Sequence, residues 1–262
     1  MSAHKPAAPR IPWTALEGSA GPRRLVSVGG SAEPTGARTF SLQALAGRFV
    51  ELSGAGASAV LTVAMQLVWE AQHHGENVAW VGVGGSTFFA PDAAHAGIDL
   101  AALPVVMAPD ALAAGRAVSH LLRSGAFGLV VLDLASLTDS SRASASKAAP
   151  SPWGPSPTRG SELRSARSSR ATGREIDLPM PLQSRLTGLA QKHGSVLVAL
   201  TSKDADQASL GSLVSLHASV RRDEEVVGLV CVDVTKDKRH GPGWSQRATF
   251  HGPAGVGTSA EM

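Results

Sequence analysis

A glycine-rich segment between a predicted strand and a predicted helix is the first place in this sequence where chemistry could occur. Residues 54–61 read GAGASAVL, and backbone N–H groups in such a turn can cradle phosphate. A nucleotide-binding loop, G-x-x-x-x-G-K-[ST], also needs the lysine for the β and γ phosphates and the hydroxyl for Mg²⁺. An apolar residue stands at each of those two positions. We therefore predict a degenerate phosphate loop without Mg-ATP binding, made of Gly54, Gly56, Ser58, Val60 and Leu61.

Two interpretations of the glycines stay open, an anion site at the helix N-terminus or a tight turn alone. The second candidate is Asp133, which ends the apolar run 129–132. A carboxylate there could be a metal ligand or could cap the loop that follows. His73 and His74 have no third ligand near them in the sequence, and no G-x-S-x-G motif of a serine hydrolase occurs. We predict no catalytic residue, no metal site and no cofactor.

Alternating strands and helices must position these residues. Apolar runs predict strands at 49–53, 78–83, 105–107, 129–132 and 196–200, and helices are predicted at 60–72, 111–123 and 182–193. Apolar strands separated by helices indicate a mainly parallel sheet covered on both faces. Three terminal strands, at 213–220, 225–234 and 246–250, predict an antiparallel edge, and the middle segment is expected to turn around Gly228 or its neighbours. The fold class is α/β, and ligands in such a sheet collect at the carboxyl ends of the strands.

Composition excludes several classes of protein. The chain has 262 residues and a single cysteine, Cys231, so it cannot contain an internal disulfide. No run of 18 apolar residues occurs, and the N-terminus lacks an apolar segment behind its charged residues. These observations argue against a transmembrane or secreted protein and predict a cytoplasmic one.

The distribution of charge divides the chain further. Residues 138–176 are rich in Ser, Arg and Pro and show no periodicity, which predicts a disordered basic insertion. Its arginines could contact the DNA backbone, and our candidates are Arg159, Arg164, Arg167, Arg170 and Arg174. A solvated linker would have the same composition. The predicted organisation is a flexible tail at 1–36, a core at 37–255 interrupted by the insertion, and a tail at 256–262.

A second cationic cluster lies near the end of the core. Lys236, Lys238 and Arg239 occur close to Trp244, beside a turn with the sequence GPG at 241–243. This pattern predicts a protruding turn that could bind phosphate or an acidic partner.

Several segments resemble the RecA recombinases. Residues 47–54 (GRFVELSG) look like the strand that enters the RecA phosphate loop, and 129–133 (LVVLD) looks like the Walker B strand. The closer resemblance is to the ImuA branch of that superfamily, which also covers the SulA-like cell-division inhibitors. It rests on an ordered set of segments: 78–81 (VAWV), 89–91 (FAP), 96–100 (AGIDL), 122–126 (LRSGA) and 237–243 (DKRHGPG).

The resemblance implies a RecA-like core that has stopped being an ATPase. Gly84 stands near the position of the RecA catalytic glutamate, and Thr201 and Ser202 replace the residues that sense the γ-phosphate. Asp133 alone of the metal-phosphate centre is retained. The expected function is that of ImuA-like proteins, a non-catalytic adaptor in inducible translesion synthesis and the SOS response. The resemblance implies as partners a Y-family polymerase homologue (ImuB-like), a DnaE-type error-prone polymerase and RecA, with localisation to the nucleoid during damage.

Two other functions follow from the same superfamily. A SulA-like inhibitor would bind the division protein FtsZ, but a small inhibitor does not need the Ser/Arg insertion or the lysine-rich C-terminal segment. An active RecA-type ATPase would need the lysine and hydroxyl that Val60 and Leu61 replace.

Overall fold

A computed structural model describes residues 39–137 and 178–249, except Ala57, Gly85, Thr87, Ala205 and Glu224. The predicted tails at 1–36 and 256–262 and the predicted insertion at 138–176 lie outside the described residues.

Within the described residues, eight strands form one sheet in the order β3-β2-β4-β5-β1-β6-β7-β8. The pairs from β3 to β6 are parallel, whereas β6–β7 and β7–β8 are antiparallel. This arrangement confirms the predicted α/β class with an antiparallel edge. The strands are β1 (Phe49–Ser53), β2 (Val78–Val83), β3 (Val105–Ala108), β4 (Leu129–Asp133), β5 (Val196–Thr201), β6 (Leu216–Arg222), β7 (Leu229–Asp237) and β8 (Trp244–Thr249).

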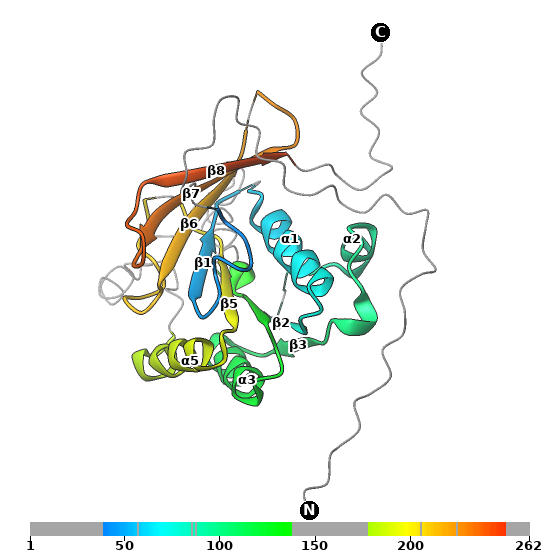
Figure 1. Ribbon diagram of the computed structural model, residues 1–262, viewed down its shortest axis with the longest axis vertical. Coiled ribbons are helices and arrows are strands. Elements are labelled where there is room, and N and C mark those ends of the chain that lie inside the picture. Colours follow the sequence, from blue (N-terminus) through cyan, green and yellow to red (C-terminus); the bar gives the residue numbers. More distant parts are fainter. Residues whose placement is uncertain are drawn as a thin grey trace, which may run out of the picture.

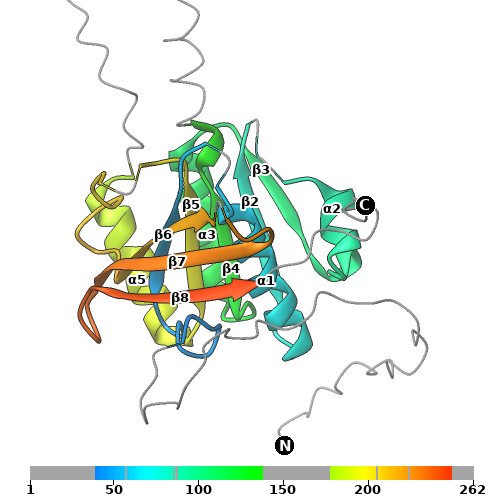
Figure 2. The same cartoon turned by 90° about the horizontal axis from the view of Figure 1, so that it is seen from above.

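Helices cover both faces of the sheet (Figures 1 and 2). On one face, α1 (Val60–His73) and α2 (Ala90–His95) contribute to a core cluster that includes Trp80. On the other face, α3 (Ala111–Ser124) and α5 (Met180–His193) pack over a second cluster around Phe49. A short 3-10 turn, Leu100–Ala102, precedes β3.

Local sequence explains where two of these helices begin and end. The Asp110 side chain accepts a hydrogen bond from the Ala113 amide and so caps α3. Gly125 and Gly194 follow α3 and α5 in the left-handed conformation, with φ of 67° and 68°, which favours glycine. The ends of α3 and α5 determine where β4 and β5 begin, and therefore where these strands reach the carboxyl edge of the sheet.

At the antiparallel edge the expected turn around Gly228 is found, but the bounds of the strands differ from the prediction. Residues 225–228 form the turn between β6 and β7 instead of the start of a strand, because the Asp223 side chain accepts hydrogen bonds from the Glu225 and Val226 amides. Gly228 then reverses the chain with φ of 82°. β6 and β8 are also shifted from the predicted 213–220 and 246–250, and the sequence did not predict α2.

Candidate functional site

The candidate site lies at the carboxyl edge of the parallel strands, where the glycine-rich segment that we predict to be a degenerate phosphate loop connects β1 to α1. The Gly54 amide donates to the Thr201 carbonyl (3.2 Å). A Cβ on Gly54 would lie 2.6 Å from Ser58 Cβ and 2.7 Å from the Val220 carbonyl oxygen, so packing alone requires glycine here. Gly56 has a φ of 63° with open space around it. Close packing therefore accounts for Gly54, and the left-handed backbone conformation accounts for Gly56.

The two residues at the positions of the lysine and the hydroxyl are directed to the apolar core, Val60 buried and Leu61 partly buried. Val60 is buried in the core cluster beneath α1, and Leu61 packs against the same cluster. An apolar side chain in the core supplies neither a cation for phosphate nor a ligand for Mg²⁺. The loop thus retains backbone amides at the helix N-terminus but no side chain that could neutralise a triphosphate.

Asp133 is fully buried at the end of β4, with both carboxylate oxygens engaged. Oδ2 accepts a hydrogen bond from Ser86 Oγ (2.6 Å), and Oδ1 accepts one from the Ala135 amide (3.1 Å). A Cβ on Gly82 would lie 2.6 Å from Ser86 Oγ, so glycine makes room for that serine. The contacts match the loop-capping interpretation of this carboxylate. Among the described residues, no three His, Cys, Asp or Glu side chains are grouped to hold a metal.

Sequence reasoning missed a buried polar network on the opposite face of the same edge. Glu51, in the middle of β1, is fully buried. Its Oε1 accepts hydrogen bonds from Thr201 Oγ1 and Lys203 Nζ, both at 3.0 Å, and its Oε2 accepts one from the Leu210 amide (2.6 Å). The carboxylate therefore fixes the loop 202–211 onto the end of the sheet. The sequence offered one signal for this network, the single acidic residue Glu51 among the apolar residues of the strand.

His217 extends this network across β6. Its Nε2 is 2.8 Å from Ser53 Oγ and its Nδ1 is 3.1 Å from Thr235 Oγ1, so both ring nitrogens are hydrogen-bonded. Burial lowers the pKa of His217 most, and Lys203 and Lys236 lower it further, while the Glu51 charge acts in the opposite direction. The imidazole is consequently neutral at pH 7 and joins the end of β1 to β7.

We expect His217 to make stability depend on pH. Because its folded-state pKa lies below the unfolded value of about 6.5, its contribution is complete above that pH and is lost as the pH falls towards the folded-state pKa. Denaturant titrations at about pH 7.5 and about pH 5.5 should show a larger loss for the wild-type chain than for His217→Asn. Equal losses in the two proteins would contradict this assignment.

The lysines of the predicted cationic surface, at the end of β7, form hydrogen bonds within the protein. Lys236 Nζ donates to Ser209 Oγ (3.1 Å) and to the Gly211 carbonyl (3.0 Å). Burial and the charge of Lys238 lower the pKa of Lys236, against the effect of Glu51. Lys238 Nζ donates to the Ser212 carbonyl (2.5 Å). Both ammonium groups thus hold the segment 209–212.

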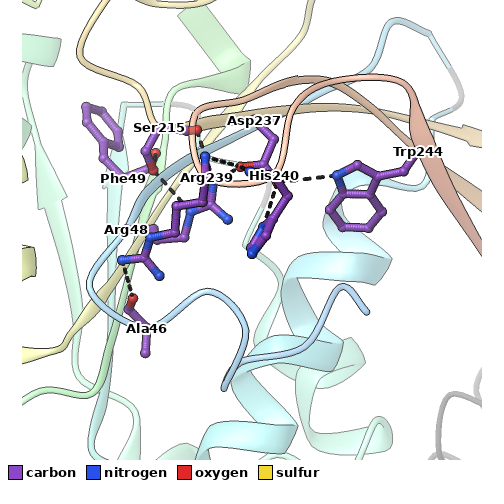
Figure 3. Close-up of polar contacts among 8 residues, drawn as sticks. All are labelled: Ala46, Arg48, Phe49, Ser215, Asp237, Arg239, His240 and Trp244. Carbon is purple, nitrogen blue, oxygen red and sulfur yellow. Dashed lines mark hydrogen bonds and ion pairs between the residues drawn. The ribbon is translucent and has the colours of Figure 1, made fainter. Parts of the chain in front are cut away.

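The other two predicted members belong to a separate network around Asp237 (Figure 3). Arg239 Nη2 donates to the Ala46 carbonyl (3.2 Å), and Trp244 Nε1 donates to Asp237 Oδ2 (3.3 Å). The structure therefore does not bring the four predicted residues together as one open basic patch. Lys236 and Lys238 hold the segment 209–212, whereas Arg239 and Trp244 help to hold the turn after β7 near the start of β1.

Asp237 and Arg48 form the centre of that network. Arg48 Nη2 donates to Asp237 Oδ1 (2.5 Å), and both side chains are almost completely buried. Arg48 also donates to the Ser215 carbonyl (3.0 Å). Burial alone would raise the pKa of Asp237, but hydrogen bonds from Arg48 and from the Arg239 and His240 amides lower it well below its usual range. The carboxylate is ionised and connects three segments of the chain: the start of β1, the turn after β7 and the start of β8.

The predicted DNA-contacting arginines, Arg159, Arg164, Arg167, Arg170 and Arg174, all lie outside the described residues.

No protein-family model and no curated protein matches this chain. In residues 39–137 and 178–249, every helix is too short or too polar to cross a membrane.

Proposed function

We propose that this chain is a non-catalytic, RecA-like adaptor in inducible translesion DNA synthesis, of the kind that the ImuA-like segments imply. Two features support the proposal: the α/β sheet with its antiparallel edge and the loss of nucleotide-binding groups at the carboxyl edge. The adaptor would recruit or bridge error-prone polymerase components, and its regulation would come from expression and partners, because no nucleotide switch is available.

The observation that carries the proposal is the state of the phosphate-loop region. Val60 and Leu61 pack into the core, and the Asp133 carboxylate is occupied by Ser86 and the Ala135 amide. Phosphoryl transfer depends on cations that neutralise the developing charge on the phosphates. A RecA-like core lacking them can keep its contact surfaces while losing catalysis.

The partners that we propose are a Y-family polymerase homologue (ImuB-like), a DnaE-type error-prone polymerase and RecA itself. The protein would be cytoplasmic and associated with the nucleoid during damage. Direct DNA contact would be weak and would come from the arginines of the basic insertion, because Lys236 and Lys238 are engaged within the protein.

Charge reversal tests the contribution of the insertion. Changing Arg164, Arg167, Arg170 and Arg174 to Glu together should abolish salt-sensitive binding to single-stranded DNA, because counterion release from phosphate contacts causes that salt dependence. Fluorescence anisotropy across a salt series measures it, with Arg116→Glu on α3 as a control elsewhere. Unaltered binding in the quadruple variant would show that the insertion is only a linker.

Affinity capture of the tagged full chain from DNA-damaged cells tests the proposed function. Nuclease is added so that shared DNA cannot imitate protein contact. Recovery of a Y-family polymerase homologue, a DnaE-type polymerase or RecA is the expected result. Recovery of FtsZ without these proteins would instead assign the chain to division control and overturn the proposal.

A further inference from the structure

The loop between β6 and β7 exposes two adjacent apolar side chains. We call residues 223–228 the hairpin tip. Val226 is 50% exposed and Val227 is 85% exposed, the largest value among the exposed large apolar residues that the structure describes. Figure 1 shows this loop, in orange, projecting beyond the end of β6 and β7. Neither valine belongs to a core cluster or packs against one.

The hairpin tip is ordered by its own hydrogen bonds. Asp223 Oδ1 accepts from the Glu225 and Val226 amides, both at 3.0 Å. The Asp223 amide donates to the Leu229 carbonyl (2.8 Å), and the Leu229 amide donates to the Val226 carbonyl (3.1 Å). Hydrogen bonds from the two amides lower the pKa of Asp223, so the cap is ionised at neutral pH. The valines are thus held in place before any partner arrives.

Such pre-ordering matters for binding, because the entropy of fixing a loop is otherwise lost on association. The stem is held in the same way: Arg221 and Asp233 form an exposed ion pair (3.0 Å), and β6 pairs with β7 up to Arg222 and Val230. A projection that is held by these hydrogen bonds and has an apolar end suits insertion into a pocket.

The charge of the hairpin tip indicates which kind of partner it could bind. Its described acids are Asp223 and the exposed Glu225, and Glu224 adds a third acid in the sequence. The exposed Arg222 and Arg247 lie on β6 and β8, in the stem, whereas residues 223–228 include no Lys or Arg. The acids directly next to the valines therefore disfavour nucleic acid and anionic lipid surfaces at the end of the tip. They favour a protein surface whose apolar pocket is bordered by lysine or arginine.

We infer that the hairpin tip is a protein-docking element whose Val226 and Val227 enter an apolar pocket with a basic rim on a partner protein. In the context of the proposed function, on which this identification of the partner rests, that protein is one of the polymerase components that the adaptor recruits. Asp223 positions the valines, and Glu225 contributes the attraction to the rim.

Photocrosslinking tests the inference in cells without assuming a partner. The full chain carries a benzophenone amino acid in place of Val227, and a second variant carries it in place of Leu100, an exposed residue elsewhere on the molecule. We expect position 227 alone to crosslink to an apolar segment flanked by Lys or Arg in another protein. Equal products from both positions, no product at 227, or crosslinks to nucleic acid, to an acidic or polar protein surface or to a second copy of this chain would overturn the inference.

Binding of the purified polymerase homologue separates the two proposals. The Val226→Ser/Val227→Ser variant should bind about tenfold or more weakly than the wild type, whereas the control Leu100→Ser should bind equally. Glu225→Gln should reduce the salt dependence of binding, and circular dichroism checks that each variant is folded. If the wild type binds and the double variant binds equally, the hairpin inference fails. If the wild type does not bind, the proposed function loses that partner, and the crosslinking result still decides the hairpin inference.

Discussion

Replacing Asp237 by Ala is expected to lower the free energy of unfolding by about 3–5 kcal/mol, because removal of one partner leaves the other charge of a buried pair uncompensated. Arg48 would keep its buried guanidinium, and the Arg239 and His240 amides would lose their acceptor. The turn after β7 would then separate from the start of β1. Denaturant unfolding followed by circular dichroism measures the change.

The matched control is the exposed ion pair in the β6–β7 hairpin. Arg221 and Asp233 have side chains that are 55% and 38% exposed, so Asp233→Ala should cost at most about 1 kcal/mol. A further variant, Arg48→Met combined with Asp237→Leu, removes both buried charges and should be more stable than Asp237→Ala. If the buried and exposed single variants lose equal stability, Asp237 does not anchor the fold as described.

Replacing Glu51 by Ala should have the next largest effect, a loss of about 3 kcal/mol, because buried donors left without an acceptor cost free energy. Thr201 Oγ1 and the Leu210 amide would both lose their partner, and Lys203 would lose its counter-charge. The loop 202–211 should also become sensitive to proteolysis, since these contacts fix it to the sheet. Denaturant unfolding and limited trypsin digestion measure the two effects.

Glu51→Gln is the informative companion, because its amide oxygen can still accept one of these hydrogen bonds while the charge is lost. We expect it to be intermediate in stability between the wild type and Glu51→Ala. If Glu51→Ala is as stable and as protease-resistant as the wild type, the loop is held by other contacts and the network has no structural role.

Local signals in the sequence account for the parts of the fold that it predicts. Asp110 begins α3, and Gly125 and Gly194 end α3 and α5, because capping depends on residues a few positions apart. The sequence predicts a turn around Gly228 but assigns residues 225–227 to the strand, because the valines have strand propensity. In the structure, the Asp223 side chain and Gly228 determine the conformation of the whole segment.

The polar networks could not be predicted because their members meet only in the folded sheet. Glu51 on β1 and His217 on β6 become neighbours of Lys203 through the strand order β5-β1-β6. Arg48 and Asp237 are separated by 189 positions in the sequence. For the same reason the lysines near residue 236 looked like an open basic surface, whereas the structure gives them carbonyl partners in the segment 209–212.

The positions of these residues indicate which parts of the protein have structural roles and which are exposed to partners. At the carboxyl edge of the sheet the buried carboxylates have structural roles: Asp133 caps a loop, and Glu51 fixes another. The hairpin tip at the antiparallel edge is the exposed element that we assign to partner binding. The proposed adaptor would therefore act through protein contacts and would have no nucleotide cycle.

The measurement that tests this claim most directly is the melting temperature of the purified full chain with increasing Mg-ATP, beside an active RecA-type ATPase as positive control. A ligand at 100 times its dissociation constant stabilises a fold by about 2.7 kcal/mol, so binding would be visible. We predict no saturable shift, because Val60 and Leu61 provide neither a phosphate-binding cation nor a magnesium ligand. A saturable upward shift would contradict the account and restore a nucleotide-dependent function.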